Sequence, residues 1–136
     1  MKNAIRISCN RSNLKVVRDF VSGYLVEYGQ NAVQVNQIIL AIDEVVANLI
    51  IHANAEDANQ YLDIRLDMHN KTFTIELRDQ GISYSPSTYL EPDLLEHIRT
   101  GKKGGVGMTL VNRIMDRVEF THSGNYNICR LYKTLA

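Results

Sequence analysis

The chain lacks several features that would place it in a specialised class of protein. Its 136 residues include only two cysteines and two prolines, and its fifteen basic residues are balanced by fifteen acidic ones. Without net charge, the chain has no overall positive field to attract nucleic acid or an anionic membrane. Any site that binds an anion must therefore be local.

Cysteines and long apolar runs are also too scarce for a disulfide framework or a membrane span. Cys9 and Cys129 lie far apart in strand-like runs without metal-ligand spacing, so we expect two buried thiols in a reducing cytoplasm. The most apolar helical stretch is interrupted by Asp43 and Glu44, which argues against a transmembrane helix. Residues 1–6 lack the apolar stretch of a signal peptide.

What is present fits one ordinary globular domain over residues 1–136. A hydrophobic share of 45% and a charged share of 22% are typical of a soluble protein. A chain of this length can bury about two-thirds of the surface that its unfolded form exposes. No internal repeat or linker divides it, so we expect a single domain.

Apolar periodicity predicts the order of helices and strands. Alternation with period two predicts strands, and apolar residues three and four apart predict helices. The predicted strands are residues 4–9, 61–68, 72–78, 117–121 and 126–132, and the predicted helices are residues 14–28, 33–55 and 106–115. Antiparallel hairpins with helices between them predict an α+β fold. We expect a two-layer α/β sandwich, in which about three helices cover one face of a mixed, mostly antiparallel sheet.

One long irregular stretch, residues 80–104, interrupts this pattern and contains both prolines, Pro86 and Pro92. Loops of this length are uncommon in compact domains and are often lids or binding segments. We therefore expect this loop to cover a ligand.

The first short motif, Glu44-x-x-x-Asn48, lies on the second predicted helix. Glu44, Asn48 and His52 are four residues apart and share one face, which alone could be the solvated side of an amphipathic helix. The amide oxygen of Asn48 is also a suitable ligand for Mg²⁺, and Glu44 could accept a proton from a hydroxyl that attacks a phosphate. His52 has no second ligand beside it, so we expect a structural role for it.

The second motif, Asp79-x-Gly81, ends a predicted strand and opens the long loop. An Asp before a Gly is a common turn signal. In an apolar pocket, however, the carboxylate would accept a hydrogen bond from the exocyclic amine of adenine. It would repel the oxygen atom that guanine presents at the same position. Gly81 would let the backbone approach the base closely.

The third motif, Gly105-x-Gly107, leads directly into a predicted helix. Glycines can also form a flexible tether, but these adjoin a helix N-terminus, whose free N–H groups and dipole attract phosphate. Lys102 and Lys103 add positive charge beside it. A dinucleotide fingerprint is disfavoured because Leu110 occupies the place of its third glycine, and no P-loop spacing is present.

In this order, the three motifs resemble the N, G1 and G2 boxes of the GHKL ATP-binding superfamily. The likeness is greatest to the single-domain anti-sigma-factor serine/threonine kinases of bacteria, and it covers nearly the whole chain. It includes the aromatic residue and proline within residues 81–86 and the segment 111–120 after the third motif. Ile51 stands where histidine kinases commonly have a basic residue, which favours the anti-sigma-kinase branch.

The resemblance implies the histidine-kinase-type ATPase fold, with ATP and Mg²⁺ as ligands. It implies that Glu44 is the catalytic base, that Asn48 holds the metal and that Asp79 determines the choice of adenine. The residues implied to contact the nucleotide are Asn48, Asp79, Gly81, Lys102, Lys103, Gly105, Val106, Gly107, Met108 and Thr109.

The resemblance further implies a cytoplasmic serine/threonine protein kinase that phosphorylates an anti-sigma-factor antagonist and sequesters a sigma factor. A homodimer is possible, and we expect no direct contact with nucleic acid or a membrane. The alternative is a non-catalytic, nucleotide-regulated protein-binding module of the same fold, although the presence of Glu44 favours the kinase. An interaction domain without any nucleotide is disfavoured because three motifs occur in the expected order.

Overall fold

The sheet contains the predicted strands. The computed structural model describes residues 2–81 and 106–135, and for residues 52, 53, 106 and 107 it describes only the backbone. The strands are β1 (Ala4–Ser8), β2 (Tyr61–His69), β3 (Thr72–Asp79), β4 (Arg117–Ser123) and β5 (Tyr126–Thr134). Their order across the sheet is β1-β2-β3-β5-β4, and all four of these pairings are antiparallel. The predicted strands are therefore confirmed, with small differences at their ends.

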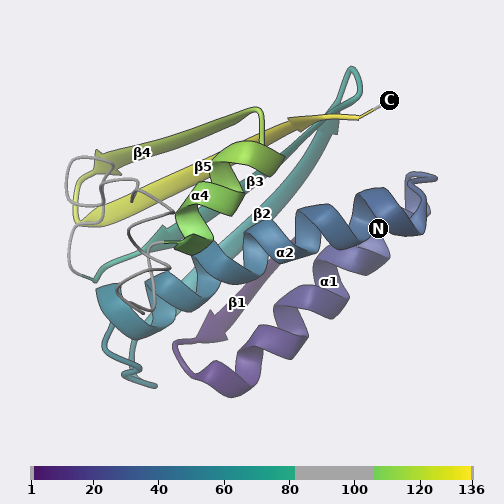
Figure 1. Cartoon of the computed structure of the whole chain (residues 1–136). Helices are drawn as coiled ribbons and strands as arrows, with labels where there is room; N and C mark the ends of the chain where they lie inside the picture. The colour runs from purple at the N-terminus through teal and green to yellow at the C-terminus, as the bar shows by residue number, and fades with distance from the viewer. Residues whose placement is uncertain (1, 82–105, 136) are drawn as a thin grey trace, which may run out of the picture.

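Helices α1 (Leu14–Glu27), α2 (Ala32–Asn48) and α4 (Val106–Ile114) lie on one face of this sheet, with α2 between the other two (Figure 1). Asn31 caps α2, because its side-chain oxygen accepts a hydrogen bond from the N–H of Gln34 at 2.8 Å. After α1, Gly29 has a φ of 81°, a conformation that glycine adopts without strain. These layers confirm the predicted α+β sandwich.

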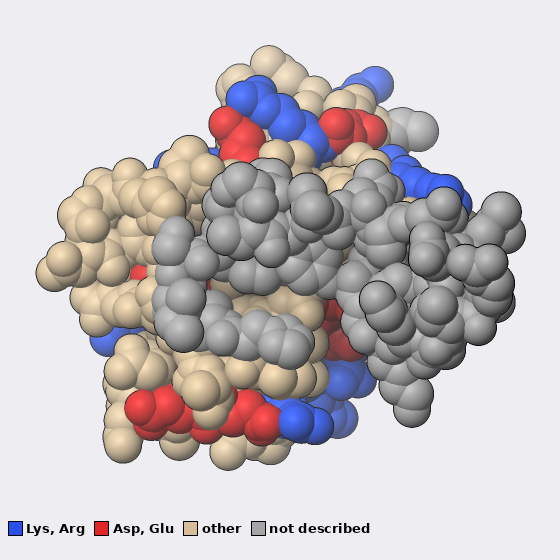
Figure 2. Space-filling model, turned by 60° about the vertical axis from the view of Figure 1, so that its left-hand side comes forward, with Lys and Arg blue, Asp and Glu red and all other residues tan. Residues whose placement is uncertain are grey.

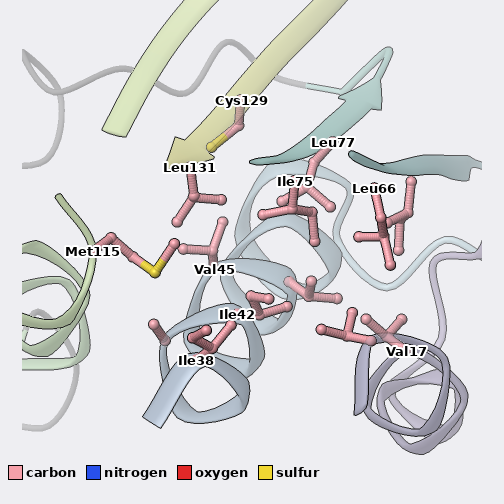
Figure 3. Close-up of a cluster of buried hydrophobic side chains, with 14 of the residues drawn as sticks. Val17, Ile38, Ile42, Val45, Leu66, Ile75, Leu77, Met115, Cys129 and Leu131 are labelled. Carbon is pink, nitrogen blue, oxygen red and sulfur yellow. The ribbon is translucent and has the colours of Figure 1, made fainter. Parts of the chain in front are cut away.

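One apolar core lies between the helices and the sheet. Figure 3 shows side chains of α2 pointing toward those of the central strands, with α1 and α4 on either side. Residues at the centre of this core include Val17, Ile38, Ile42, Val45, Leu66, Ile75, Leu77, Met115, Cys129 and Leu131. Because interiors of proteins are close-packed, this core fixes α2 relative to the ends of β3 and β5.

The stretch Ala32–Ile51 is long and apolar enough to cross a membrane by length and composition alone, with a mean hydropathy of 1.4. In the fold, however, one side of this helix is buried against the sheet and the neighbouring helices, including Val35, Ile38 and Val46. A helix with one apolar face turned inward is typical of a globular core.

The end of the second helix differs from the sequence prediction. The spacing predicts a regular α-helix to about residue 55, but the α-helix ends at Asn48 and Leu49–Ala53 form a π-helix. The main-chain N–H and the side-chain Nδ2 of Asn54 both donate to the carbonyl oxygen of Leu49, at 3.1 and 2.8 Å. Both bonds reach back five residues, as in a π-helix, so they stabilise this wider helical turn. The regular α-helical spacing from which the sequence places residues 44, 48 and 52 on one face therefore holds only as far as Asn48.

The face of the sheet away from the helices carries paired charges. Arg6 donates two hydrogen bonds to Asp63, at 2.7 and 3.1 Å, and Arg78 and Arg130 both donate to Glu76, at 2.6 and 3.0 Å. Burial alone would raise the pKa of Glu76, but the two arginines outweigh it and hold this pKa below its ordinary value. At the end of the molecule that Figure 2 brings forward, basic and acidic side chains likewise lie side by side.

Both cysteines are free and buried, as the sequence predicts, with 0% of Cys9 and 2% of Cys129 exposed. Burial raises the pKa of Cys9 to about 11 and that of Cys129 to about 12, and the charge of Asp79 contributes to both. At pH 8 such thiols are ionised in at most about one molecule in a thousand. We expect neither thiol to react quickly with a disulfide reagent until the protein is denatured. One rapidly titrating thiol in the native protein would contradict this.

Candidate nucleotide-binding site

The three sequence motifs lie on elements that pack against one another. The first motif lies on α2, which packs against α4, the helix that begins within the third motif. The segment after α2 reaches the end of β3, where the second motif begins, through a hydrogen bond from Asn54 to Asp79. Figure 1 shows the ends of these three elements on the same side of the molecule.

Asp79 is the last residue of β3, and its side chain is turned into the core with 2% of its surface exposed. Its Oδ1 accepts hydrogen bonds from the N–H of Gly81 at 3.2 Å and from Nδ2 of Asn127 at 2.9 Å. Its Oδ2 accepts one long bond of 3.4 Å from Nδ2 of Asn54. A carboxylate has about four acceptor positions, so Oδ2 retains capacity for a donor from outside the protein.

Asn127 is a part of this site that the sequence motifs did not reveal. It lies opposite Asp79 in the pairing of β3 with β5, and its Nδ2 donates to Asp79 and also to the carbonyl oxygen of Gly81, at 2.8 Å. Its Oδ1 lies 2.9 Å from Nδ1 of His122. Asn127 therefore fixes the turn between Asp79 and Gly81 from the neighbouring strand. Only the strand register, which pairs positions 79 and 127, could have indicated it.

A narrow recess, lined mostly by apolar residues and too small to hold a water molecule, lies beside Asp79. The residues around it are Leu49, Leu77, Asp79, Phe120, Asn127, Ile128 and Cys129. Apolar walls with a few placed polar groups are typical of sites for small molecules. A donor that reached the carboxylate there would form a hydrogen bond shielded from water, whereas an oxygen atom would be repelled.

On α2, Glu44 and Asn48 lie one turn apart and are both half-buried. Nδ2 of Asn48 is buried without a hydrogen-bond partner. The carboxylate of the preceding residue, Asp43, accepts a hydrogen bond from Arg18 of α1 at 2.9 Å. Because buried polar groups are normally paired, the partnerless amide nitrogen indicates a place where a ligand could supply a hydrogen-bond acceptor.

Within the described residues, no group of three or more His, Cys, Asp or Glu side chains could hold a metal ion. Asn48 offers an amide oxygen, which is a ligand type that Mg²⁺ accepts. Mg²⁺ keeps several waters and commonly takes other ligands from phosphate groups. The residues present therefore fit a metal ion that arrives with a nucleotide.

The N-terminal end of α4 has the properties of an anion site. Val106, the middle residue of the third motif, begins the helix, and Met108 and Thr109 in its first turn are 5% and 2% exposed. Oγ1 of Thr109 is buried and has no hydrogen-bond partner. The first N–H groups of a helix also lack partners within the helix, and its dipole favours negative charge there.

Several predicted site residues lie outside the described part of the chain. These are Lys102, Lys103 and Gly105, together with residues 82–104 of the predicted lid. For Val106 and Gly107, only the backbone is described. Their contacts with nucleotide stay predictions.

The match with known families covers almost the whole chain. The model of the histidine kinase-like ATPase domain matches residues 7–133. The chain belongs to this family. Because ATP-binding domains define the family, a nucleotide is the ligand class that its members share, in agreement with the recess at Asp79 and the N-terminus of α4.

Similar curated proteins are named as kinases or anti-sigma factors. The serine-protein kinase RsbW of Halalkalibacterium halodurans is 32% identical over 76% of this chain, which spans 65% of the length of that relative. The anti-sigma F factor of Geobacillus stearothermophilus is 21% identical over 84% of this chain and 78% of its own length. Serine-protein kinases and anti-sigma factors are therefore among the named relatives of this chain, and these are the proteins that the sequence resemblance predicts.

Solved structures confirm the fold. The structure of the SiaB–SiaC complex from Pseudomonas aeruginosa matches with a TM-score of 0.64 and 11% identity, over 97% of this chain and 89% of that one. The RsbU and RsbW domains of Rv1364c from Mycobacterium tuberculosis match with the same TM-score and 16% identity, over 96% of this chain and 30% of that one. At these identities the similarity concerns the fold alone.

Proposed function

We propose that this chain is an ATP-dependent serine/threonine kinase of the anti-sigma-factor type. It binds Mg·ATP at the site described above and phosphorylates an anti-sigma-factor antagonist. When the antagonist is phosphorylated, the chain sequesters a sigma factor. The observation that supports this best is the buried carboxylate of Asp79 beside an apolar recess, next to a helix that carries Glu44 and Asn48. The name of one relative, an anti-sigma F factor, supports a sigma factor as a partner, and we further propose a location in the cytoplasm.

Recognition of the base begins at Asp79. Its free acceptor capacity at Oδ2 suits the exocyclic amine of adenine, and the bonds from Gly81 and Asn127 keep the carboxylate in place before the base arrives. The residues around the recess are mostly apolar, which suits the faces of a purine ring, but the recess would have to widen to admit one, because it has no room for a water molecule. This arrangement selects ATP over GTP.

The phosphates lie toward α2 and α4 in this proposal. The N–H groups at the start of α4 and the hydroxyl of Thr109 donate to phosphate oxygens, and Lys102 and Lys103 add positive charge. Asn48 holds the Mg²⁺, which neutralises charge on the phosphate oxygens when it is bound. The partnerless Oγ1 of Thr109 and Nδ2 of Asn48 are donors, so each would gain a partner by donating to a phosphate oxygen, while the amide oxygen of Asn48 would hold the metal.

Glu44 is placed one turn before Asn48, within the same helix, and it accepts the proton of the attacking serine or threonine hydroxyl. Phosphoryl transfer requires mainly positioning of the reactants and stabilisation of charge. One side chain that acts as a base beside the metal ligand is therefore sufficient for the transfer step. The lid predicted for residues 80–104 would exclude water from this reaction.

Replacing Asn48 with Ala should remove most of the gain in ATP affinity that Mg²⁺ provides. The physical reason is that the substitution deletes the amide oxygen proposed to hold the metal. Isothermal titration with ATP, in Mg²⁺ and in excess chelator, measures this gain directly. Asn36→Ala, an exposed amide on the same helix, should keep the gain. An unchanged gain in Asn48→Ala would contradict the metal assignment.

The proposed function is tested by incubating the protein with Mg²⁺, γ-labelled ATP and candidate antagonist proteins encoded nearby. We expect label on a serine or threonine of one antagonist, and binding of a sigma factor that depends on this phosphorylation. Transfer to none, with ATP-dependent binding of a partner, would favour the non-catalytic binding module. Absence of ATP binding would contradict both. Light scattering of the same samples tests the predicted homodimer.

A further inference from the structure

Asn54 lies between the π-helix and Asp79, outside all three sequence motifs. The residue is buried, with 5% of its surface exposed. Nδ2 donates to the carbonyl oxygen of Leu49 at 2.8 Å and to Oδ2 of Asp79 at 3.4 Å. These two acceptors orient the amide, because exchanging its nitrogen and oxygen would place an acceptor against each of them.

The other end of this amide is unsatisfied. Oδ1 of Asn54 is buried and has no hydrogen-bond partner. Such atoms are rare because a buried acceptor without a partner is unfavourable, and each requires an explanation. Closing the turn of the π-helix uses only the NH₂ end of Asn54, so that role does not explain the oxygen.

The backbone after Asn54 is held in a conformation that is unfavourable for these residues. Ala55 and Glu56 have φ angles of 51° and 54°, in the left-handed region. The N–H of Glu56 donates to the carbonyl oxygen of Ile50 at 2.8 Å, and its carboxylate accepts a hydrogen bond from Arg11 at 2.7 Å. Backbone strain of this kind persists only where the surroundings impose it, and it is concentrated at functional sites. The side chain of Asn54 is therefore held by Leu49 and Asp79, and the main chain that follows it is held by the bonds of Glu56 to Ile50 and Arg11.

We propose that Asn54 is a second base-recognition residue, whose Oδ1 accepts one N–H of the adenine amine while Oδ2 of Asp79 accepts the other. The inference rests on the proposed nucleotide site. An exocyclic amine has two N–H groups. The amide of Asn54 bonds to Oδ2 of Asp79 at 3.4 Å, so its partnerless Oδ1 is a second acceptor in the neighbourhood of that carboxylate. A guanine nucleotide would place its carbonyl oxygen against both acceptors. Asn54 thus increases the selectivity that Asp79 alone would provide.

The test compares ATP with purine riboside triphosphate, which has a hydrogen in place of the amine. Asn54→Ala should bind ATP about tenfold more weakly, because one hydrogen bond to the amine is lost. It should bind purine riboside triphosphate as the wild type does. The affinity ratio of the two nucleotides therefore falls about tenfold. Asn59→Ala, an exposed amide in the same connection, is the matched control and should keep the wild-type ratio.

If Asn54→Ala lowered the affinity for both nucleotides equally, the inference would be overturned. That result would mean that Asn54 only holds the main chain in position and does not contact the amine. If this variant does not fold, the wild type alone decides the matter with N6-methyl-ATP, which has a single N–H. It should bind about tenfold more weakly than ATP, since one of two hydrogen bonds is lost. Equal affinity would overturn the inference. A wild type that binds neither ATP nor ADP would instead overturn the proposed function.

Discussion

Replacing Glu44 with Gln is expected to slow phosphoryl transfer to the antagonist by about 10²–10⁴-fold, the usual contribution of a positioned general base. The amide has nearly the shape of the carboxylate but does not accept the proton of the attacking hydroxyl. Binding of Mg·ATP should therefore stay at the wild-type level. Single-turnover transfer from γ-labelled ATP, at saturating nucleotide, measures the chemical step, and titration of the same samples measures affinity.

Asp43→Asn is the matched control, since it changes a carboxylate to an amide one position earlier on the same helix. Asp43 accepts a hydrogen bond from Arg18 at the surface, where an ion pair contributes about 0–1 kcal/mol to stability. This variant should transfer at close to the wild-type rate. Transfer by Glu44→Gln as fast as by the wild type would show that Glu44 is not the base.

The fold could be predicted because its signals are local. The hairpin of β2 and β3 follows from alternation in two adjacent segments and a short turn, where Asn70 and Lys71 both have positive φ angles. The buried face of α2 follows from residues three and four apart. Each signal lies within one element or two adjacent ones, so it can be recognised in the sequence without knowledge of the tertiary structure.

The motifs of the candidate site can be recognised in the sequence for the same reason, whereas the residues that support them cannot. Glu44 and Asn48 lie one turn apart on one helix, and Asp79 is followed at once by Gly81. Asn127, by contrast, meets Asp79 only through the pairing of β3 with β5. No spacing along the chain indicates that contact.

The π-helix was missed because its cause is not a property of residues 49–53. A regular α-helix was the expectation from the apolar spacing, and Leu49 and Ile50 are both buried as that spacing predicts. The change in hydrogen bonding comes from Asn54, whose main chain and side chain bond to the same carbonyl oxygen. π-helical turns are frequent at functional sites, and this one places Asn54 against the carboxylate of Asp79.

Replacing Asp79 with Ala should abolish the preference for adenine nucleotides and most of the affinity for ATP. In the wild type, GTP would place an oxygen against the buried carboxylate, and a buried polar group without a suitable partner costs about 1–3 kcal/mol. That range corresponds to a preference for ATP of about 5–150-fold. The substitution also removes the acceptor for Gly81, Asn127 and Asn54, so some loss of stability is expected.

Asp79→Asn separates recognition from stability. Its amide oxygen can still accept the bonds from Gly81 and Asn127, while an NH₂ group replaces Oδ2 and favours the oxygen of guanine over the amine of adenine. We therefore expect a folded protein whose preference for ATP over GTP is lost or reversed. Asp67→Ala, an exposed carboxylate on β2, is the control and should keep the wild-type preference. The measurement is the affinity of each variant for ATP and GTP by titration, and equal affinity of the wild type for both nucleotides would contradict the role of Asp79.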